Sequence, residues 1–210
     1  MHVVVIPDGN RRYNRVHNLI DYDKSLDALK TLIHWARNHS SVSELSLFCW
    51  SSENWKRSEE EIVVAMDYLL RFLKTIYENK DPLVLYECFS SSLDKLSVPI
   101  RDLMRDINEE ARRLSVESEK SLKVYLYISY GFHEETETMH RGYLNSTILP
   151  HSQPDLLIRT SGERRISNMC MWHLAYTELM FIDEFFPECT ELTWNRCIEN
   201  YKTRSRRFGV

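Results

Sequence analysis

Near the start of the chain, the stretch Val3-Val4-Val5-Ile6-Pro7-Asp8-Gly9-Asn10-Arg11-Arg12 joins an apolar run to a carboxylate, a glycine and two guanidinium groups. A continuous apolar run is typical of a strand that is buried on both faces of a parallel sheet. In such sheets ligands bind beyond the carboxyl ends of the strands. The stretch therefore predicts a parallel sheet with a ligand site just after its first strand.

A second stretch, residues 155–168, repeats this arrangement with the sequence DLLIRTSGERRISN. An apolar strand is again followed by arginines, hydroxyl groups and a glycine turn. A guanidinium group fits phosphate oxygens two at a time, so each stretch suits a diphosphate. Two anion sites and one carboxylate able to hold Mg²⁺ point to an enzyme that brings two diphosphates together.

Strand and helix patterns alternate along the rest of the chain, with no internal repeat and no Pro/Gly-rich linker. This order predicts an α/β fold, a single domain over residues 1–210 with a central, mostly parallel β-sheet flanked by helices. Strands are expected at 3–6, 45–49, 84–89, 122–130 and 156–159. Helices are expected at 24–38, 59–79, 100–114 and 192–204, with a short helical piece after Gly131.

Composition excludes several classes of protein. The net charge of −4 argues against a general nucleic-acid binder. No run approaches the roughly 18 apolar residues that span a bilayer, and no signal peptide is expected, because Met1 falls almost directly on the first strand. The cysteines are odd in number and lack CxxC spacing, which is typical of reduced thiols in a cytoplasmic protein.

The loop Ser51-Ser52-Glu53-Asn54-Trp55-Lys56-Arg57 lies between the second strand and a long helix. It could be a simple capping loop with Trp55 buried. Its hydroxyl, carboxylate, amide, indole and guanidinium groups favour a function instead. In that interpretation Asn54 and a serine hydroxyl handle a proton at the reacting carbon, and Trp55 shields a cationic, apolar substrate from water.

Two carboxylates are candidates for a metal site. An Asp-Gly pair such as Asp8-Gly9 is usually only a turn, but a carboxylate at a strand end is also well placed to hold Mg²⁺. Glu178 sits in an apolar stretch and needs an arginine or a metal as partner. Histidines at positions 2, 34 and 39 show no metal-binding spacing and are interpreted as structural.

Taken together, these stretches resemble the cis-prenyltransferases, the undecaprenyl diphosphate synthase family. The resemblance covers nearly the whole chain. It is carried by residues 2–12, 51–57, 155–163, 165–168, 175–181 and 204–209.

The resemblance implies a Mg²⁺-dependent α/β enzyme, a homodimer or a heterodimer, that condenses an allylic diphosphate with isopentenyl diphosphate, the homoallylic substrate, and releases diphosphate. Asp8 would hold Mg²⁺ and assist departure of the allylic diphosphate, and Glu178 would complete the metal site. Asn54, with Ser51, Ser52 and Glu53, would serve proton removal and positioning. The allylic substrate would be bound by Gly9, Asn10, Arg11, Arg12, Tyr13, Trp55 and Arg57. The homoallylic diphosphate would be bound by Arg159, Arg165, Ile166 and Ser167, with Arg206 and Arg207 reaching across the dimer.

This sequence departs from the family pattern mainly in the allylic half. Arg11 replaces a usual glycine, Tyr22 lies where a His or Arg is usual, and Phe132 replaces a glycine. Trp50 and Phe132 are bulky beside the expected reaction site, and a bulky wall stops growth of an apolar chain. We therefore expect a short product of about two to four isoprene units, or an irregular head-to-middle (lavandulyl-type) coupling.

Two other functions compete with this hypothesis. A non-catalytic subunit of a two-component prenyltransferase would be expected to lose Asp8 and Asn54, which this chain keeps. A diphosphate hydrolase would need a positioned water, whereas aromatic residues around the expected site favour a hydrocarbon. Membrane contact is expected to be at most peripheral, because no amphipathic anchor stands out.

Overall fold

The computed structural model describes residues 1–114, 121–140 and 152–205. Its centre is a parallel sheet with the strand order β3-β4-β2-β1-β5-β6. The strands are β1 (His2–Ile6), β2 (Glu44–Ser51), β3 (Val84–Phe89), β4 (Leu122–Tyr130), β5 (Leu156–Arg159) and β6 (Glu178–Phe181). The helices are α1 (Asn10–His17), α2 (Asp23–Asn38), α3 (Glu59–Glu78), α4 (Val98–Leu114), α5 (Phe132–His140) and α6 (Glu191–Lys202). The predicted α/β fold with a central parallel sheet is confirmed.

The strand order reverses beside β1, and this reversal positions the site. Strands β2, β4 and β3 extend from one side of β1, while β5 and β6 extend from the other. Residue Ile6 at the end of β1 is in register with Arg159 at the end of β5. Ligand crevices in parallel sheets form where the order reverses. The loops after β1 and β5 therefore open into the same crevice.

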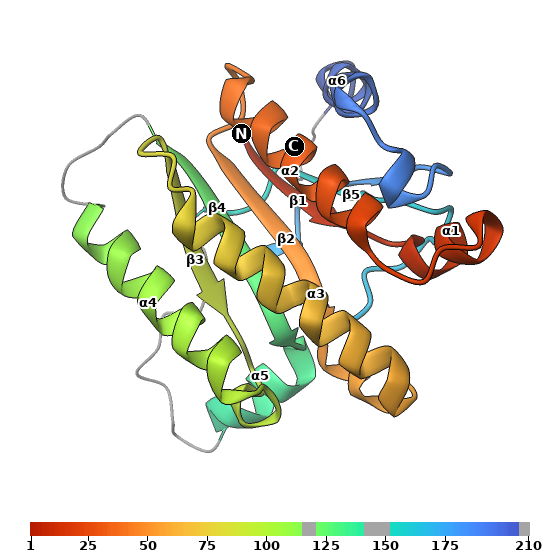
Figure 1. Cartoon of the computed structure of the whole chain (residues 1–210). Coiled ribbons are helices and arrows are strands. Elements are labelled where there is room, and N and C mark those ends of the chain that lie inside the picture. The colour runs from red at the N-terminus through yellow and green to blue at the C-terminus, as the bar shows by residue number, and fades with distance from the viewer. Residues whose placement is uncertain (115–120, 141–151, 206–210) are drawn as a thin grey trace.

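The main core lies between the sheet and the helices α2, α3 and α4, which cover one face in Figure 1. Their apolar residues recur at helical spacing and include Leu32 and Leu73, which are fully buried. A second cluster of mainly aromatic side chains packs on the other face, around Tyr127 and Phe48, against the segment that contains Ile166 and Met169. Both faces of the sheet are thus covered, as the continuous apolar strands require.

Two elements differ from the sequence prediction. Helix α1 follows β1 directly, although residues 10–17 contain almost no apolar periodicity. Strand β6 is a short edge strand in which Glu178 and Leu179 are partly exposed, so it lacks the buried run of the inner strands. Both elements are small, and their formation depends on neighbours rather than on their own pattern.

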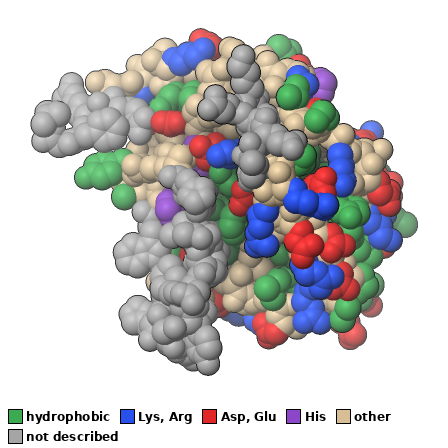
Figure 2. All heavy atoms as spheres, turned by 90° about the vertical axis from the view of Figure 1, so that its left-hand side faces the viewer, with side chains coloured by type: hydrophobic (Ala, Val, Ile, Leu, Met, Phe, Trp, Pro, Cys, Tyr) green, Lys and Arg blue, Asp and Glu red, His purple; other side chains and the backbone are tan. Residues whose placement is uncertain are grey.

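The surface carries side chains of both charges, in line with the small net charge of −4. Figure 2 shows basic and acidic side chains interspersed on the described part of one face, the one on the left in Figure 1. On α4 these charges form local pairs, such as Arg105 with Asp102 and Arg113 with Glu110. Within the described ranges, no helix combines the length and the apolar character needed to cross a membrane.

Candidate active site

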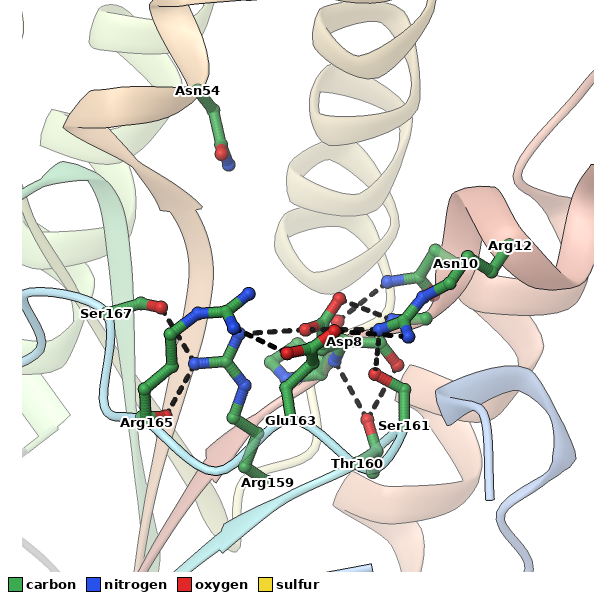
Figure 3. Close-up of polar contacts among 12 residues, drawn as sticks. Asp8, Asn10, Arg12, Asn54, Arg159, Thr160, Ser161, Glu163, Arg165 and Ser167 are labelled. Atoms are coloured by element: carbon green, nitrogen blue, oxygen red, sulfur yellow. Dashed lines mark hydrogen bonds and ion pairs between the residues drawn. The ribbon is translucent and has the colours of Figure 1, made fainter. Parts of the chain in front are cut away.

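The Asp8 carboxylate is fixed in the loop after β1 (Figure 3). Its Oδ2 atom lies 2.8 Å from Arg159 Nη2, and its Oδ1 accepts a hydrogen bond from the Gly9 backbone N–H at 2.6 Å. Thr160 Oγ1 accepts from the Asp8 N–H at 2.8 Å and donates to the Asp8 carbonyl at 2.7 Å. Burial raises the pKa of Asp8, but the bonds from Arg159 and Gly9 outweigh it, so the pKa is lowered overall. Asp8 is therefore ionised at neutral pH.

Arg159 links this carboxylate to the loop that follows β5. The side chain is only 4% exposed, and its Nη1 atom donates to the Arg165 carbonyl at 2.5 Å and to Ser167 Oγ at 2.7 Å. A buried guanidinium group needs such partners because an unpaired buried charge is costly. The prediction that Asp8 and Arg159 meet at one edge of the sheet is confirmed.

Further charges surround this pair at the open side of the crevice. Arg12 donates to Ser161 Oγ at 2.5 Å and lies 3.3 Å from a Glu163 oxygen, while Arg165 pairs with the other Glu163 oxygen at 2.5 Å. Arg12 and Arg165 are both substantially exposed. Exposed ion pairs of this kind contribute little to stability, so a diphosphate can replace Glu163 as the partner of either arginine.

A second basic group comes from α1 and the loop after β2. Arg57 donates to Asn54 Oδ1 at 2.8 Å and lies over the Trp50 ring at 5.0 Å. Burial, followed by the nearby charge of Arg11, lowers the pKa of Arg57, yet an arginine stays charged. Arg11 itself pairs with Glu61 on α3 at 2.8 Å. Figure 3 shows Asn54 apart from the Asp8 group, with its amide directed towards it.

One cavity of about 480 Å³ connects both basic groups to an apolar end. Helix α1, the end of β5 and the neighbouring loops supply the charged lining, whereas β2 and the inner faces of α2 and α3 supply most of the apolar lining. Small-molecule sites usually combine apolar walls with convergent polar groups, and this lining contains both, with an unusually large charged part. The apolar end is lined by Leu29, Cys49, Ala65, Tyr68, Leu69 and Phe72.

Most of the site residues expected from the sequence line this cavity. They are Asp8, Gly9, Asn10, Arg11, Arg12, Ser51, Glu53, Asn54, Arg57, Arg159, Arg165 and Ser167. Trp50 lines the cavity as expected, but Phe132 is absent from the described lining. Of the two bulky residues expected to limit the product length, only Trp50 is therefore placed to do so.

Four residues expected to bind substrate are placed elsewhere, outside the described lining. Trp55 is half-buried; it donates its indole N–H to Ser129 Oγ at 2.8 Å and packs edge-on against Trp50, an arrangement that fits a capping loop. Ser52 is buried beside Gly131. Tyr13 contacts the His17 ring, and Ile166 packs against the aromatic cluster under the sheet.

Within one chain, Glu178 and Asp8 lie at opposite ends of the parallel strands: Glu178 is the first residue of β6, whereas Asp8 follows the last residue of β1. It is in register with Leu156, the first residue of β5, whereas Arg159 is the last. Three residues of strand separate these levels by about 10 Å. The partner of Glu178 is Arg204, at 3.0 Å, so the predicted pairing with an arginine is confirmed. A shared metal site with Asp8 is not formed within the chain.

Two other expectations concern parts that the structure does not describe. Arg206 and Arg207 lie outside the described residues. The structure contains one chain, so the homodimer stays a prediction.

His2 is structural as expected, since its buried ring contacts Ser46 Oγ at 2.8 Å and Ser152 Oγ at 3.0 Å.

The donors near Asp8 suit Mg²⁺ only in combination with a substrate. In residues 1–114, 121–140 and 152–205, no cluster of three or more His, Cys, Asp or Glu side chains is present. Mg²⁺ commonly binds through one or two carboxylates and completes its shell with water and substrate phosphates. Asp8, with Glu163 in the same cavity, fits a site of that kind, which would form together with a bound diphosphate.

Several lining residues were not assigned to the site from the sequence. Arg15 lies one helical turn beyond Arg11 on α1, so recognising this helix would have identified it. Tyr22 and Glu163 stand beside residues that were assigned. The apolar residues of α2 and α3 were expected in the core, because periodicity alone does not separate a core face from a cavity wall.

Comparison with known proteins gives consistent results. The family model described as "Putative undecaprenyl diphosphate synthase" matches residues 6–209. An isoprenyl transferase of Aquifex pyrophilus is 30% identical, over 99% of this chain and 95% of that protein. The "Ditrans,polycis-undecaprenyl-diphosphate synthase ((2E,6E)-farnesyl-diphosphate specific)" of Haemophilus influenzae is 31% identical, over 99% and 94%.

Two solved structures share the fold. A probable undecaprenyl diphosphate synthase from Campylobacter jejuni has a TM-score of 0.78 and 27% identity, covering 100% of this chain and 98% of that one. The lavandulyl diphosphate synthase of Lavandula x intermedia, solved with dimethylallyl diphosphate, also has a TM-score of 0.78, with 23% identity and the same coverage. The second match supports the fold alone.

Proposed function

The chain belongs to the undecaprenyl diphosphate synthase family of prenyltransferases, and from this premise we propose that it condenses an allylic diphosphate with isopentenyl diphosphate into a short cis-prenyl diphosphate. The observation that carries the proposal is the single cavity in which Asp8, the two basic groups and a small apolar end lie together. A transferase of this kind needs two diphosphate receptors on either side of the new carbon–carbon bond. Arg12 and Arg57 belong to one of them, and Arg159, Arg165 and Ser167 form the other.

In the reaction, the bond between C1 of the allylic group and its diphosphate oxygen breaks, and the electron pair leaves with the diphosphate. Arg12 and Arg57 face the departing group and offset its developing charge. The Trp50 ring borders the allylic end, where an aromatic face stabilises positive charge. When bound at Asp8, Mg²⁺ would add charge neutralisation at the same diphosphate.

The double bond of isopentenyl diphosphate then attacks C1, and a proton leaves its C2 carbon. Arg159, Arg165 and Ser167 hold the diphosphate of this second substrate. Asn54 accepts a hydrogen bond from Arg57 with its side-chain oxygen, and a neutral amide is not a base. We therefore assign Asn54 to orienting a diphosphate oxygen with its N–H groups, and that oxygen to accepting the proton.

The size of the cavity favours a short product. Taking about 30 Å³ for each carbon-sized group, an undecaprenyl chain alone needs several times the cavity volume of about 480 Å³. Trp50 is 5% exposed and closes the wall beside Cys49.

The test is the mass of the product. Incubation with dimethylallyl or geranyl diphosphate, isopentenyl diphosphate and Mg²⁺ should give products of about two to four isoprene units, and EDTA should abolish them. Products of ten or more units would refute the short-chain proposal. A branched ten-carbon product from dimethylallyl diphosphate alone would indicate head-to-middle coupling. Free diphosphate without any prenyl product would indicate a hydrolase, and no turnover at all would indicate a non-catalytic subunit.

A further inference from the structure

Three segments from distant parts of the chain converge on Gly131, which lies outside the described cavity lining. A Cβ atom on Gly131 would collide with Glu134 Oε2, Ser52 Oγ and Asn168 Nδ2. These side chains come from α5, from the loop after β2, and from the loop after β5. The last two loops also carry Asn54 and Ser167, which line the cavity. This junction thus ties together the two loops that hold the reacting groups.

Asn168 makes most of the bonds at the junction. Its carbonyl accepts from the Phe132 N–H at 2.9 Å, and its Oδ1 accepts from the His133 N–H at 3.0 Å. Its Nδ2 donates to Glu134 Oε2 at 3.2 Å. Burial raises the pKa of Glu134, but polar contacts with Ser52, the α5 backbone and Asn168 lower it overall. The carboxylate is therefore a charged acceptor, and a bond to a charged group is stronger than a neutral one.

The backbone shows that this loop is held under constraint. Ser167 and Asn168 have φ angles of 49° and 64°, both in the left-handed region. Asparagine tolerates this region better than most residues, whereas serine does so at a cost. Such a conformation persists only when the surroundings fix it. The bonds of Asn168 to α5 are among the contacts that fix it.

Ser167 and Asn168 are connected to Asp8 through the side chain of Arg159. Ser167 Oγ accepts from Arg159 Nη1 at 2.7 Å, and Arg159 Nη2 contacts Asp8 at 2.8 Å. A shift of Asn168 would move Ser167 and the Arg165 carbonyl, both of which position the Arg159 guanidinium group. Asn168 itself is absent from the described cavity lining.

We propose that Asn168, through its bond to Glu134, is a positioning residue that sets the receptor for the isopentenyl diphosphate. This inference rests on the proposed function, because it assigns that receptor to Arg159, Arg165 and Ser167. Its role is indirect: it fixes the loop in the conformation that presents these groups. Substrate bound at the other receptor should be affected much less, since Arg57 and Arg11 are held by other contacts.

The test is the substitution Asn168→Asp, which keeps the Oδ1 acceptor for His133 and the tolerance for positive φ. It removes the donor to Glu134 and places two carboxylates side by side. By calorimetry with Mg²⁺ present, affinity for isopentenyl diphosphate should fall about tenfold, as expected for one charged hydrogen bond. The KM for isopentenyl diphosphate should rise by the same factor, and the KM for the allylic substrate should change less than about twofold.

The companion change Glu134→Gln distinguishes this role from a general loss of stability. In the double variant, Asn168→Asp with Glu134→Gln, the side-chain amide at position 134 can donate a hydrogen bond to the carboxylate at position 168. The affinity for isopentenyl diphosphate should therefore return to within about threefold of that of the unsubstituted protein. Asn79→Asp, at the exposed end of α3, is the matched control and should leave affinity unchanged. Unchanged affinity in Asn168→Asp, or no recovery in the double variant, would overturn the proposal. An original protein that binds isopentenyl diphosphate but makes no prenyl product would refute the proposed function and leave the binding test valid.

Discussion

Replacing Asp8 with asparagine should lower kcat by about a thousandfold while the protein stays folded. The introduced amide oxygen can still accept one bond from Arg159, but the carboxylate charge that would hold Mg²⁺ is lost. Measurements of kcat and KM for both substrates, with thermal unfolding as the check on folding, test this. An Asp8→Asn variant with more than a tenth of the original kcat would show that Asp8 is not part of the chemistry.

The alanine variant at the same position separates catalysis from stability. Asp8→Ala leaves the buried Arg159 guanidinium group without its carboxylate, and breaking such a pair costs about 3–5 kcal/mol when both partners are buried. Because Asp8 is 31% exposed, we expect less than this range. Asp8→Ala should thus lower both kcat and the midpoint of unfolding, whereas Asp8→Asn should lower mainly kcat.

Replacing Trp50 with leucine should lengthen the product by one or more isoprene units. Trp50 lies where β2 meets the cavity, beside Cys49 and under the Arg57 guanidinium group. A smaller side chain leaves space for added methylene groups in a wall that otherwise stops the chain. Chromatography and mass spectrometry of the products would show the shift.

A control is needed because Trp50 also packs against Trp55 at a ring distance of 5.6 Å. Large-to-small changes in a core typically cost about 2–5 kcal/mol. Trp55→Leu removes a similar volume next to the cavity but outside its described lining, so it should destabilise the protein without lengthening the product. Equal product lengths in Trp50→Leu and the original protein would show that Trp50 does not limit chain growth.

Strand ends were the part of the site that the sequence could predict. The apolar runs that end at Ile6 and Arg159 have a buried, parallel pattern, and parallel strands bring their carboxyl ends to one edge. From this alone, Asp8 and Arg159 were expected to meet. Arg57 and Asn54 followed from the same rule applied to β2. None of these predictions required knowledge of the neighbouring helices.

The remaining features depend on contacts between distant segments. The apolar setting of Glu178 predicted a partner, but only the register of β6 shows that this residue lies at the start of its strand. The sequence of α1 is too polar to show an apolar helical pattern, so the helix was not predicted and Arg15 was not assigned to the site. Trp55 could face a ligand or the core, and its bond to Ser129 decides this. Asn168 stood in a recognised stretch, yet its role emerges only from its contacts with α5.

The central claim is that one sheet edge holds two diphosphates at once, with Asp8 and Arg159 between them. The direct measurement is a calorimetric titration of the protein, in Mg²⁺, with isopentenyl diphosphate in the presence of a saturating, non-reactive thio analogue of geranyl diphosphate. The account predicts that each chain binds one molecule of each ligand independently. Competition between the two ligands for one site per chain would contradict it.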